Sequence, residues 1–559
     1  MNVADLLQKH AAARADEMAL AEPIAGRWNR SELPMHKRYR CVTFKELDGD
    51  SSQLAAGLRQ LGVTPGTRMA LLIPPGIEFI SWVFALFKAG VVTVLIDPGM
   101  GRKNMIDCLA RVQTKGFIGI SKAQAMRALL RHRFPLATTN VTVGRRWFWG
   151  GATAKQLRAL TVNIDNSFAA EPSDPAAIIF TTGSTGPPKG VHYCHENFYQ
   201  QVLQIQEHYA IQPGGSDLPA FPLFGLFNAA MGVATIFPVM DPTRPAKVTP
   251  ENIIQPIQDW KIGQAFGSPA LWKVVGDYCD RNGTKLKSLK RILSAGAPVP
   301  NRVLQQMTSA MQEDGEMYTP YGATEALPVA SISAGEVLLE TACQTDQGAG
   351  TCVGHKFSGI QWQVIKITDD PLEDISQTES VPHGTIGELI VQGPVVTSHY
   401  VTHEEETRNH KIKDQDGFWH RMGDVGYLDS QQRFWFCGRK SQRVILAEKT
   451  LYTAPTEAVM NQHPKIERCA LVPLLVDQQP RAGIVVQMGP DHFPPTNAAQ
   501  RVETDEILQY ASQNELTADI QYAFIRKDLP VDIRHNAKIS RGKLARWAQD
   551  KLASRSPQP

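Results

Sequence analysis

Apolar and polar positions follow one pattern over the first half of the chain and a different one beyond about residue 380. From about residue 45 to residue 300, apolar stretches of helical length alternate with short β-branched runs such as Val91–Ile96 and Ala176–Phe180. This alternation is typical of an α/β protein with a mostly parallel sheet. The most apolar stretch runs from Phe79 to Asp97, but Lys88 and Gly90 interrupt it. It is too short for a membrane span, and we predict a buried helix followed by a buried strand.

Beyond residue 380 the pattern changes to short strand-like runs separated by turns and charged residues. Gly387–Gln392 and Arg433–Cys437 are of this kind. Further along, Ala470–Val476 and Gly483–Met488 are predicted to be strands and Thr504–Asn514 a helix. Together they are enough for a small α+β unit of roughly 120 residues.

A chain of 559 residues is too long for a single hydrophobic core of ordinary size, so at least two domains are expected. We predict an α/β protein in three parts. The large N-terminal domain, residues 1–437, combines parallel or mixed sheets with helices. Residues 438–441 form a hinge, and a small mobile α+β domain occupies residues 442–559.

Composition and charge give little information about the cellular location of the protein or the molecules that it binds. The formal net charge is +3, from 58 basic and 55 acidic side chains, which predicts no strong field for steering nucleic acid or an anionic membrane surface. The eight cysteines are scattered without metal-binding spacing, as expected for reduced cytosolic thiols. Residues 1–20 are predicted to be an amphipathic helix rather than an export signal. We expect a cytoplasmic protein without a transmembrane segment.

A segment rich in glycine, hydroxyl groups and one lysine follows the predicted strand Ala176–Phe180. Glycines let backbone N–H groups approach phosphate oxygens, hydroxyls donate further hydrogen bonds, and the lysine adds positive charge. The segment lacks the Gly-Lys-Ser/Thr order of a Walker loop, and by composition alone it could be only a turn. Its residues are Thr181, Thr182, Gly183, Ser184, Thr185, Gly186, Pro187, Pro188, Lys189 and Gly190.

In the order of its residues this segment resembles the phosphate loop of the adenylate-forming superfamily, which includes acyl-CoA synthetases, adenylation domains and luciferases. Further motifs similar to those of the superfamily follow in the same order across nearly the whole chain. They are Phe87–Gly90 with Ile96–Pro98, Ser294–Pro298, Tyr321–Glu325, Gly387–Leu389 with Gly393, Met422–Asp424 with Met in place of Thr, Gly438–Arg439 and Lys538.

The resemblance implies an enzyme that binds ATP and Mg²⁺ and joins a carboxylate to AMP. Charge repulsion between the carboxylate and the phosphates opposes this reaction unless the site neutralises them. By resemblance, Glu325 holds Mg²⁺, Thr324 bonds the α-phosphate, and Lys538 bridges the carboxylate and the phosphate in the transition state. Those three residues are therefore the expected catalytic residues.

Nucleotide binding is implied for further residues of the same motifs. Tyr321 is expected to lie against the adenine, with Gly322 beside it in the same motif. Asp424 is expected to accept both ribose hydroxyls, a role that suits an ionised carboxylate. Arg439 is expected to contact the ribose or a phosphate. The segment along the adenine is expected to contain Gly296, Ala297 and Pro298.

Three departures from thioester-forming relatives bear on the second step. Ser441 stands at the hinge position, and Glu448 stands where those relatives have a glycine near the pantetheine path. Pro222-Leu223-Phe224-Gly225 also lacks the histidine found near the acyl pocket of the family. These changes place coenzyme A transfer in doubt.

Within this superfamily the sequence resembles the OleC-type β-lactone synthetases of bacterial long-chain olefin biosynthesis. This resemblance rests on Met240–Pro245, Gly348–Gly354, Phe436–Lys440 and Pro530–Lys538. It implies adenylation of a 2-alkyl-3-hydroxyalkanoic acid, whose own 3-hydroxyl then displaces AMP to form a β-lactone. It also implies a long-chain 3-hydroxy acid substrate and an opportunity for association with thiolase-like and α/β-hydrolase-like enzymes. The small net charge predicts no nucleic-acid partner.

Two alternatives remain at this point. The first is a long-chain fatty acid–CoA ligase, which would form a thioester from the acyl-adenylate. The second is a catalytically silent nucleotide- or acyl-binding protein, which the presence of Glu325 and Lys538 disfavours. Gly348–Gly354 misses the glycine spacing of a dinucleotide site by one residue, and His403–Glu406 lacks the second histidine of a zinc helix, so the sequence predicts neither site.

Overall fold

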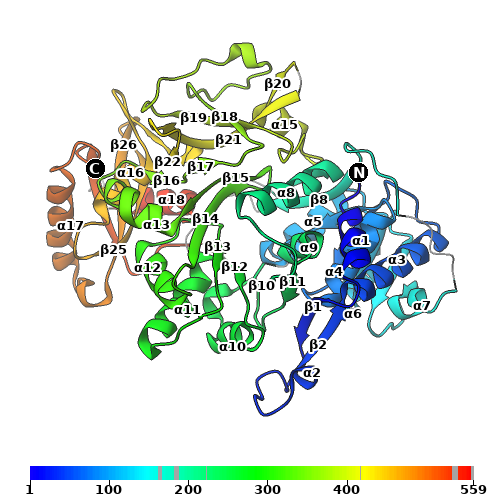
Figure 1. Ribbon diagram of the computed structural model, residues 1–559. Coiled ribbons are helices and arrows are strands. Elements are labelled where there is room, and N and C mark those ends of the chain that lie inside the picture. The colour runs from blue at the N-terminus through cyan, green and yellow to red at the C-terminus, as the bar shows by residue number, and fades with distance from the viewer. Residues whose placement is uncertain (162–166, 182–187, 222, 416, 532–538, 555–559) are drawn as a thin grey trace.

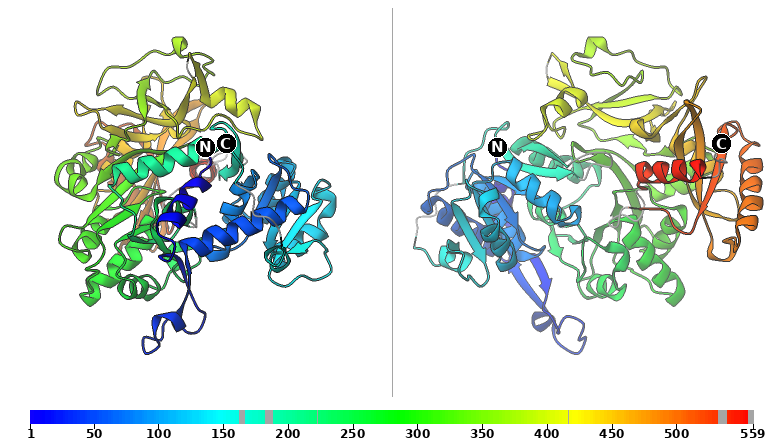
Figure 2. Two further views of the ribbon diagram at one scale, coloured as in Figure 1. Left: turned by 45° about the vertical axis from the view of Figure 1, so that its right-hand side comes forward. Right: turned by 180° about the vertical axis from the view of Figure 1, so that it is seen from behind.

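The computed structural model describes all 559 residues except 162–166, 182–187, 222, 416, 532–538 and 555–559 (Figure 1). Two large sheets with helices on their faces make up most of the N-terminal part. A smaller antiparallel sheet lies above them, and a three-stranded unit lies at the side that carries the C-terminus (Figures 1 and 2). The expected α/β architecture is therefore confirmed.

The first large sheet has seven strands in the order β7-β6-β5-β3-β4-β8-β9, and only the β8–β9 pair is antiparallel. Its longest helix, α3 (Phe44–Gln60), begins at a capping box in which Thr43 and Glu46 satisfy each other's backbone N–H groups. The strands are β3 (Arg68–Leu72), β4 (Val92–Leu95), β5 (Gly116–Ile120), β6 (Thr139–Val143), β7 (Ala152–Thr153), β8 (Pro175–Thr181) and β9 (Lys189–Cys194), and the other helices are α4 (Ile77–Lys88), α5 (Arg102–Arg111), α6 (Ser121–Leu129) and α7 (Ala154–Arg158).

The second large sheet has nine strands in the order β17-β15-β14-β13-β12-β10-β11-β1-β2, parallel in the middle and antiparallel at both edges. Its strands are β1 (Met18–Pro23), β2 (Tyr39–Thr43), β10 (Ser216–Pro219), β11 (Ala234–Ile236), β12 (Gln264–Gly267), β13 (Arg291–Ser294), β14 (Glu316–Ala323), β15 (Ala326–Ser333) and β17 (His355–Lys356). The accompanying helices are α1 (Ala4–Ala13), α2 (Met35–Arg38), α8 (His195–His208), α9 (Phe224–Met231), α10 (Glu251–Asp259), α11 (Pro269–Asn282), α12 (Asn301–Ala310), α13 (Ala334–Glu336) and α14 (Ala342–Asp346).

The third sheet is antiparallel, with the order β16-β22-β21-β19-β18 and β20 paired to β21. Its elements are β16 (Thr351–Cys352), β18 (Gln361–Ile365), β19 (Gly387–Gln392), α15 (Glu404–His410), β20 (Lys411–Asp414), β21 (Gly417–Leu428) and β22 (Phe434–Arg439). Strand β22 therefore includes the first two residues of the expected hinge.

The C-terminal unit pairs β25-β26-β27 and buries its own apolar side chains on both faces of that sheet. Its elements are β23 (Val444–Ile445), β24 (Thr450–Leu451), α16 (Thr453–Met460), β25 (Ile466–Val476), β26 (Gln479–Met488), α17 (Asn497–Ala511), β27 (Ile520–Arg526) and α18 (Arg541–Ala553). The limits proposed for the domains remain an interpretation.

Two predicted helices have different limits. The N-terminal helix ends at Ala13, and Met18–Pro23 form strand β1 instead, because this segment pairs with β11 and β2 in the nine-stranded sheet. The helix predicted over Thr504–Asn514 begins earlier, since the Thr496 hydroxyl accepts a hydrogen bond from the Ala499 N–H, 3.1 Å away, and caps α17.

Lys88 ends the apolar helix α4, and no described helix is long and apolar enough to cross a lipid bilayer. The lysine is 1% exposed, and its ammonium group reaches across to α3. There it donates to the Asp48 carboxylate at 2.5 Å and to the Ser51 and Ser52 hydroxyls at 2.8 Å. Burial lowers the pKa of Lys88, and the Asp48 carboxylate opposes that shift. Lys88, which interrupts the apolar run of the sequence, therefore connects α4 to α3 through buried hydrogen bonds.

We predict that Lys88→Ala lowers the free energy of unfolding by about 3–5 kcal/mol, because it leaves the Asp48 carboxylate without its ammonium partner and opens a cavity. Urea denaturation followed by tryptophan fluorescence measures the change. Lys45→Ala, at an exposed position on α3, is the matched control and should have little effect. Equal denaturation midpoints for the two variants would contradict the structural role of Lys88.

Candidate active site

The expected catalytic pair Thr324 and Glu325 forms the two-residue turn between β14 and β15. Gly322 precedes this turn where the two strands approach closely. A Cβ atom added there would lie 2.7 Å from the Ala326 carbonyl oxygen. A larger residue would push the strands apart and displace the turn, so steric crowding explains why this position of the motif is a glycine.

Three hydrogen-bonding residues from outside the hairpin hold the turn. The Tyr193 hydroxyl on β9 donates to the Thr324 carbonyl oxygen. Both the backbone N–H and the hydroxyl of Thr397 donate to the Glu325 carbonyl oxygen, at 2.9 and 3.0 Å. The Tyr400 hydroxyl donates to Glu325 Oε1 at 2.8 Å. The Glu325 carboxylate is therefore fixed in position by segments that are far from it in the sequence.

Tyr400 is itself placed by pairing of its segment with β9, since Val191 and Tyr400 form an antiparallel bridge. Burial raises the pKa of Tyr400, and the neighbouring Glu325 carboxylate raises it further. The phenol therefore stays protonated and remains a hydrogen-bond donor to Glu325 over the physiological pH range.

Lys189 begins β9, at the end of the expected phosphate loop. Its ammonium group forms an ion pair with Glu406 Oε2 on α15, 2.5 Å away, and lies 5.3 Å from the centre of the Tyr400 ring. The sequence did not predict the Glu406 partner, because this ion pair joins residues that are 217 positions apart in the chain. A phosphate that binds Lys189 would compete with the Glu406 carboxylate for the lysine.

A second lysine lies behind the Glu325 turn. Lys411 at the start of β20 is buried, and its ammonium group donates to the Thr397 carbonyl oxygen. Burial lowers the pKa of Lys411 to about 7, and the Glu325 carboxylate opposes the shift. No sequence motif pointed to this residue, because a single lysine in a strand has no distinguishing pattern.

Asp424, Tyr321 and Arg439, for which the sequence predicted contacts with one nucleotide, lie together. Asp424 on β21 is 2% exposed and faces Arg439 across the β21–β22 pair. The Tyr321 hydroxyl donates to Asp424 Oδ2, and Arg439 Nη1 lies 3.0 Å from Asp424 Oδ1. Burial, and then the Asp424 charge, raise the pKa of Tyr321. Both carboxylate oxygens thus have protein partners, which ribose hydroxyls would have to share or replace.

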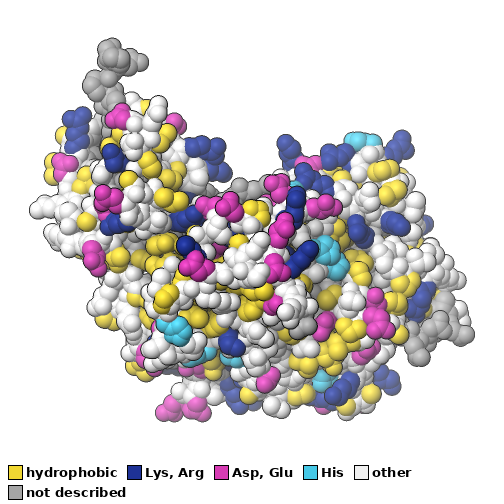
Figure 3. Space-filling model, turned by 90° about the horizontal axis from the view of Figure 1, so that it is seen from above, with side chains coloured by type: hydrophobic (Ala, Val, Ile, Leu, Met, Phe, Trp, Pro, Cys, Tyr) yellow, Lys and Arg dark blue, Asp and Glu magenta, His cyan; other side chains and the backbone are white. Residues whose placement is uncertain are grey.

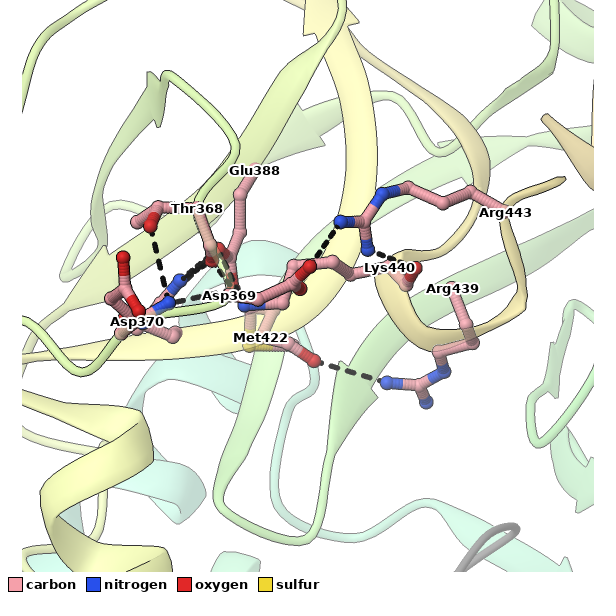
Figure 4. Close-up of polar contacts among 9 residues, drawn as sticks. Thr368, Asp369, Asp370, Glu388, Met422, Arg439, Lys440 and Arg443 are labelled. Carbon is pink, nitrogen blue, oxygen red and sulfur yellow. Dashed lines mark hydrogen bonds and ion pairs between the residues drawn. The ribbon is translucent and has the colours of Figure 1, made fainter. Parts of the chain in front are cut away.

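The segment after Arg439 is tied to the antiparallel sheet (Figure 4). Lys440 Nζ lies 3.0 Å from the buried Glu388 carboxylate, which also pairs with Arg421 at 2.6 Å. Arg443 Nη2 lies 2.6 Å from Asp369 Oδ2. Ser441 and Glu448, two of the three departures from thioester-forming relatives, are exposed in this region. Figure 3 shows a notch between the C-terminal part on the left and the N-terminal part on the right.

An apolar cavity of about 180 Å³ opens beside the carboxyl ends of β12 and β13. Gly296, on its wall, has a φ of +99°, a conformation that favours glycine, and follows β13 at the start of the expected adenine segment with Ala297 and Pro298. Most of the wall is apolar; Phe221, Phe224, Phe227, Phe266 and Phe357 contribute aromatic rings. The cavity therefore offers an apolar chain a place next to that segment.

Gln201 on α8 is a polar exception on this wall. It is 2% exposed, and its amide nitrogen donates to the Leu327 carbonyl oxygen at 2.9 Å, which fixes the orientation of the amide. Its Oε1 has no hydrogen-bond partner among the described residues. The Tyr209 hydroxyl, also on the wall, is paired with Ser331 Oγ at 2.9 Å. The wall residue Gln201 therefore contributes a buried acceptor for which the described part of the chain supplies no donor.

Several predicted residues cannot be placed. Lys538 lies outside the described residues, and the roles proposed for all the site residues remain predictions. Thr181 ends β8. The rest of the expected phosphate loop that lies outside the described residues comprises Thr182, Gly183, Ser184, Thr185, Gly186 and Pro187.

Comparisons with known proteins agree on one family. The family model described as "AMP-binding enzyme" matches residues 7–401. An olefin beta-lactone synthetase from Xanthomonas campestris is 40% identical over 98% of this chain and 97% of its own length. One from Stenotrophomonas maltophilia is 40% identical over 99% of each chain. The crystal structure of the anthranilate CoA ligase AuaEII with anthranoyl-AMP matches the fold with a TM-score of 0.77 at 18% identity, covering 99% of this chain and 98% of that one.

Proposed function

The chain belongs to the AMP-binding enzyme family, and from this premise we propose that it converts a 2-alkyl-3-hydroxyalkanoic acid and ATP into a β-lactone, AMP and pyrophosphate. The observation that carries the proposal is the 40% identity to olefin beta-lactone synthetases over nearly the full length of both chains. Ser441 and Glu448 also support it, since neither matches the thioester-forming pattern. The protein is an AMP-forming acid ligase.

In the first step a carboxylate oxygen of the acid attacks the α-phosphorus of ATP. The bond from that phosphorus to the bridging oxygen breaks, and pyrophosphate leaves with the electron pair. Thr324 donates to the α-phosphate, and Lys538 offsets the negative charge shared by the carboxylate and the phosphate. Asp424 and Arg439 hold the ribose end of the nucleotide, so that the α-phosphorus lies next to the acid.

In the second step the 3-hydroxyl oxygen attacks the carbonyl carbon of the acyl-adenylate. The bond from that carbon to the AMP oxygen breaks, AMP leaves, and the hydroxyl proton is released. The four-membered ring is strained, but the nucleophile is tethered two carbons from the carbonyl and adenylate is a good leaving group. Ring closure therefore needs no separate nucleophile, such as coenzyme A, to enter the site.

A Mg²⁺ ion fits the chemistry of the Glu325 carboxylate. The carboxylate supplies hard oxygen ligands, which Mg²⁺ prefers. Its Oε1 accepts a hydrogen bond from Tyr400, whereas no described residue donates a hydrogen bond to Oε2. The described residues contain no cluster of three or more His, Cys, Asp or Glu that could hold a metal ion. Glu325 would therefore share the ion with phosphate oxygens and water, and the ion would neutralise phosphate charge during adenylation.

The apolar cavity is the proposed place for the alkyl part of the acid. Its end at Ala295 and Gly296 lies next to the expected nucleotide segment, so an acid bound there directs its carboxylate toward the α-phosphate. Gln201 Oε1 is then the acceptor for the 3-hydroxyl group, since a buried acceptor without a donor is costly. This contact would retain acids that carry the nucleophile for ring closure.

We predict that the purified enzyme converts ATP and a long-chain 3-hydroxy acid into AMP, pyrophosphate and the acid minus one water, without coenzyme A. Mass spectrometry of the lipid product and a coupled pyrophosphate assay measure both halves of the reaction. The matched control is the 3-deoxy acid, which can be adenylated but has no hydroxyl for ring closure. Turnover that requires coenzyme A and yields a thioester would establish the acyl-CoA ligase instead.

We predict that Gln201→Met lowers kcat/KM for the 3-hydroxy acid about tenfold more than for the 3-deoxy acid, the difference expected for one hydrogen bond to the substrate. The bond to the Leu327 carbonyl oxygen is lost for both acids alike. ATP–pyrophosphate exchange measures adenylation of both acids. Ile205→Met, an apolar change on the same wall, is the matched control and should affect the two acids alike. Equal losses for both acids in the Gln201 variant would contradict the assignment of the hydroxyl acceptor.

A further inference from the structure

The small net charge of the whole chain conceals one strongly basic segment. Between Asp107 and Asp165 there is no acidic residue. The same 57 positions carry ten Lys or Arg residues, so the remainder of the chain has 48 basic and 55 acidic side chains. The net charge of the whole chain therefore does not describe this segment, which is strongly positive. The expectation that the protein does not attract an anionic membrane surface used the charge of the whole chain and does not apply to this segment.

The segment forms one edge of the seven-stranded sheet, with α5, α6 and α7 around it. It lies at the opposite side of the molecule from α17 (Figures 1 and 2). Some of its charges are used internally: Arg127 is buried, Arg133 pairs with Asp107, and Arg158 pairs with Asp50 and Glu78. Lys115, Lys122, Arg131, Arg145, Arg146 and Lys155 are exposed.

Large apolar side chains are exposed among these cations. Phe148 is 78% exposed, Leu129 75% and Trp147 59%, although the fold has ample core in which to bury such residues. The Arg145 guanidinium lies 5.0 Å from the centre of the Trp147 ring. We call the group Leu129, Arg131, Arg145, Arg146, Trp147 and Phe148 the basic aromatic surface.

The loop that carries the two aromatic residues is held at its base. The Ser121 hydroxyl donates to the Arg145 carbonyl oxygen at 2.6 Å, and Arg127 donates to the Trp149 carbonyl oxygen at 3.2 Å. The Trp149 indole donates to the Thr142 hydroxyl at 3.0 Å. Both contacts to α6 place the loop beside the helix that ends at Leu129. Trp147 and Phe148 are thus presented to solvent by a supported loop.

We propose that the basic aromatic surface docks the enzyme on an anionic lipid bilayer. Aromatic rings and leucine insert at the level of the headgroups, and arginines attract anionic headgroups within a Debye length. A leucine at the same site favours a bilayer over a nucleic acid, because aromatic rings stack on bases whereas leucine gains most from acyl chains. The inference does not depend on the proposed reaction, although a long-chain acid also partitions into bilayers.

The test is cosedimentation of the full-length protein with vesicles of phosphatidylcholine containing one quarter phosphatidylglycerol. We expect binding to these vesicles, at least tenfold weaker binding to pure phosphatidylcholine, and weaker binding at higher salt. Trp147→Ser with Phe148→Ser should lower the partition coefficient at least tenfold, and Arg145→Gln with Arg146→Gln should remove the preference for phosphatidylglycerol. Thermal melting checks that the variants fold.

The matched control is Leu339→Ser with Val502→Ser, which removes two exposed apolar side chains elsewhere and should leave vesicle binding unchanged. Three results would overturn the proposal. They are absence of vesicle binding by the parent protein, equal binding by the Trp147 and Phe148 variant, and tighter binding to single-stranded polynucleotide or to an acidic protein that vesicles do not displace.

Discussion

The two-residue turn at Thr324 and Glu325 is the constraint on which the candidate site depends. The first large sheet contributes the Tyr193 hydroxyl to the turn, and the segment beyond β19 contributes Thr397 and Tyr400. The second large sheet contributes the hairpin itself. Sheets formed by distant parts of the chain therefore meet at two residues. If any of them shifted, the carboxylate proposed to share a cation with ATP would move relative to the cavity and to Asp424.

Local motifs made part of this arrangement predictable. The two strands approach closely at Gly322, and Glu325 and Asp424 stand in motifs that resemble those of the adenylate-forming superfamily, so the sequence could single out these three residues. The strand–helix alternation also predicted the α/β fold, and the comparisons confirm the family. Tyr400, Thr397 and Glu406 could not be predicted, because they act through tertiary contacts and stand in no pattern of their own. The early strand β1 was missed for the same reason: besides the nearby β2, it pairs with β11, which is more than 200 residues away.

The location of each charged residue in the fold was more informative than the hydropathy or net charge of the segment that contains it. Lys88 interrupts an apolar run, yet it is buried and bonded to α3. The net charge of +3 is nearly neutral, yet ten cations and no acidic residue occupy the stretch between Asp107 and Asp165. At the expected hinge, Lys440 is paired with Glu388 of the antiparallel sheet, and Arg443 is paired with Asp369 in the loop after β18. Each case shows that the fold determines whether a charge stabilises packing, anchors a segment or faces solvent.

The central claim is that the carboxylate is activated and the 3-hydroxyl closes the ring, and isotope tracing tests it most directly. The 3-hydroxy acid is labelled with ¹⁸O in both carboxylate oxygens, and the AMP and lactone are analysed by mass spectrometry. The account predicts one ¹⁸O in AMP, one in the lactone carbonyl, none in pyrophosphate, and an unlabelled ring oxygen. Unlabelled AMP together with a lactone that retains both ¹⁸O atoms would show that the hydroxyl, rather than the carboxylate, is activated, and would contradict the account.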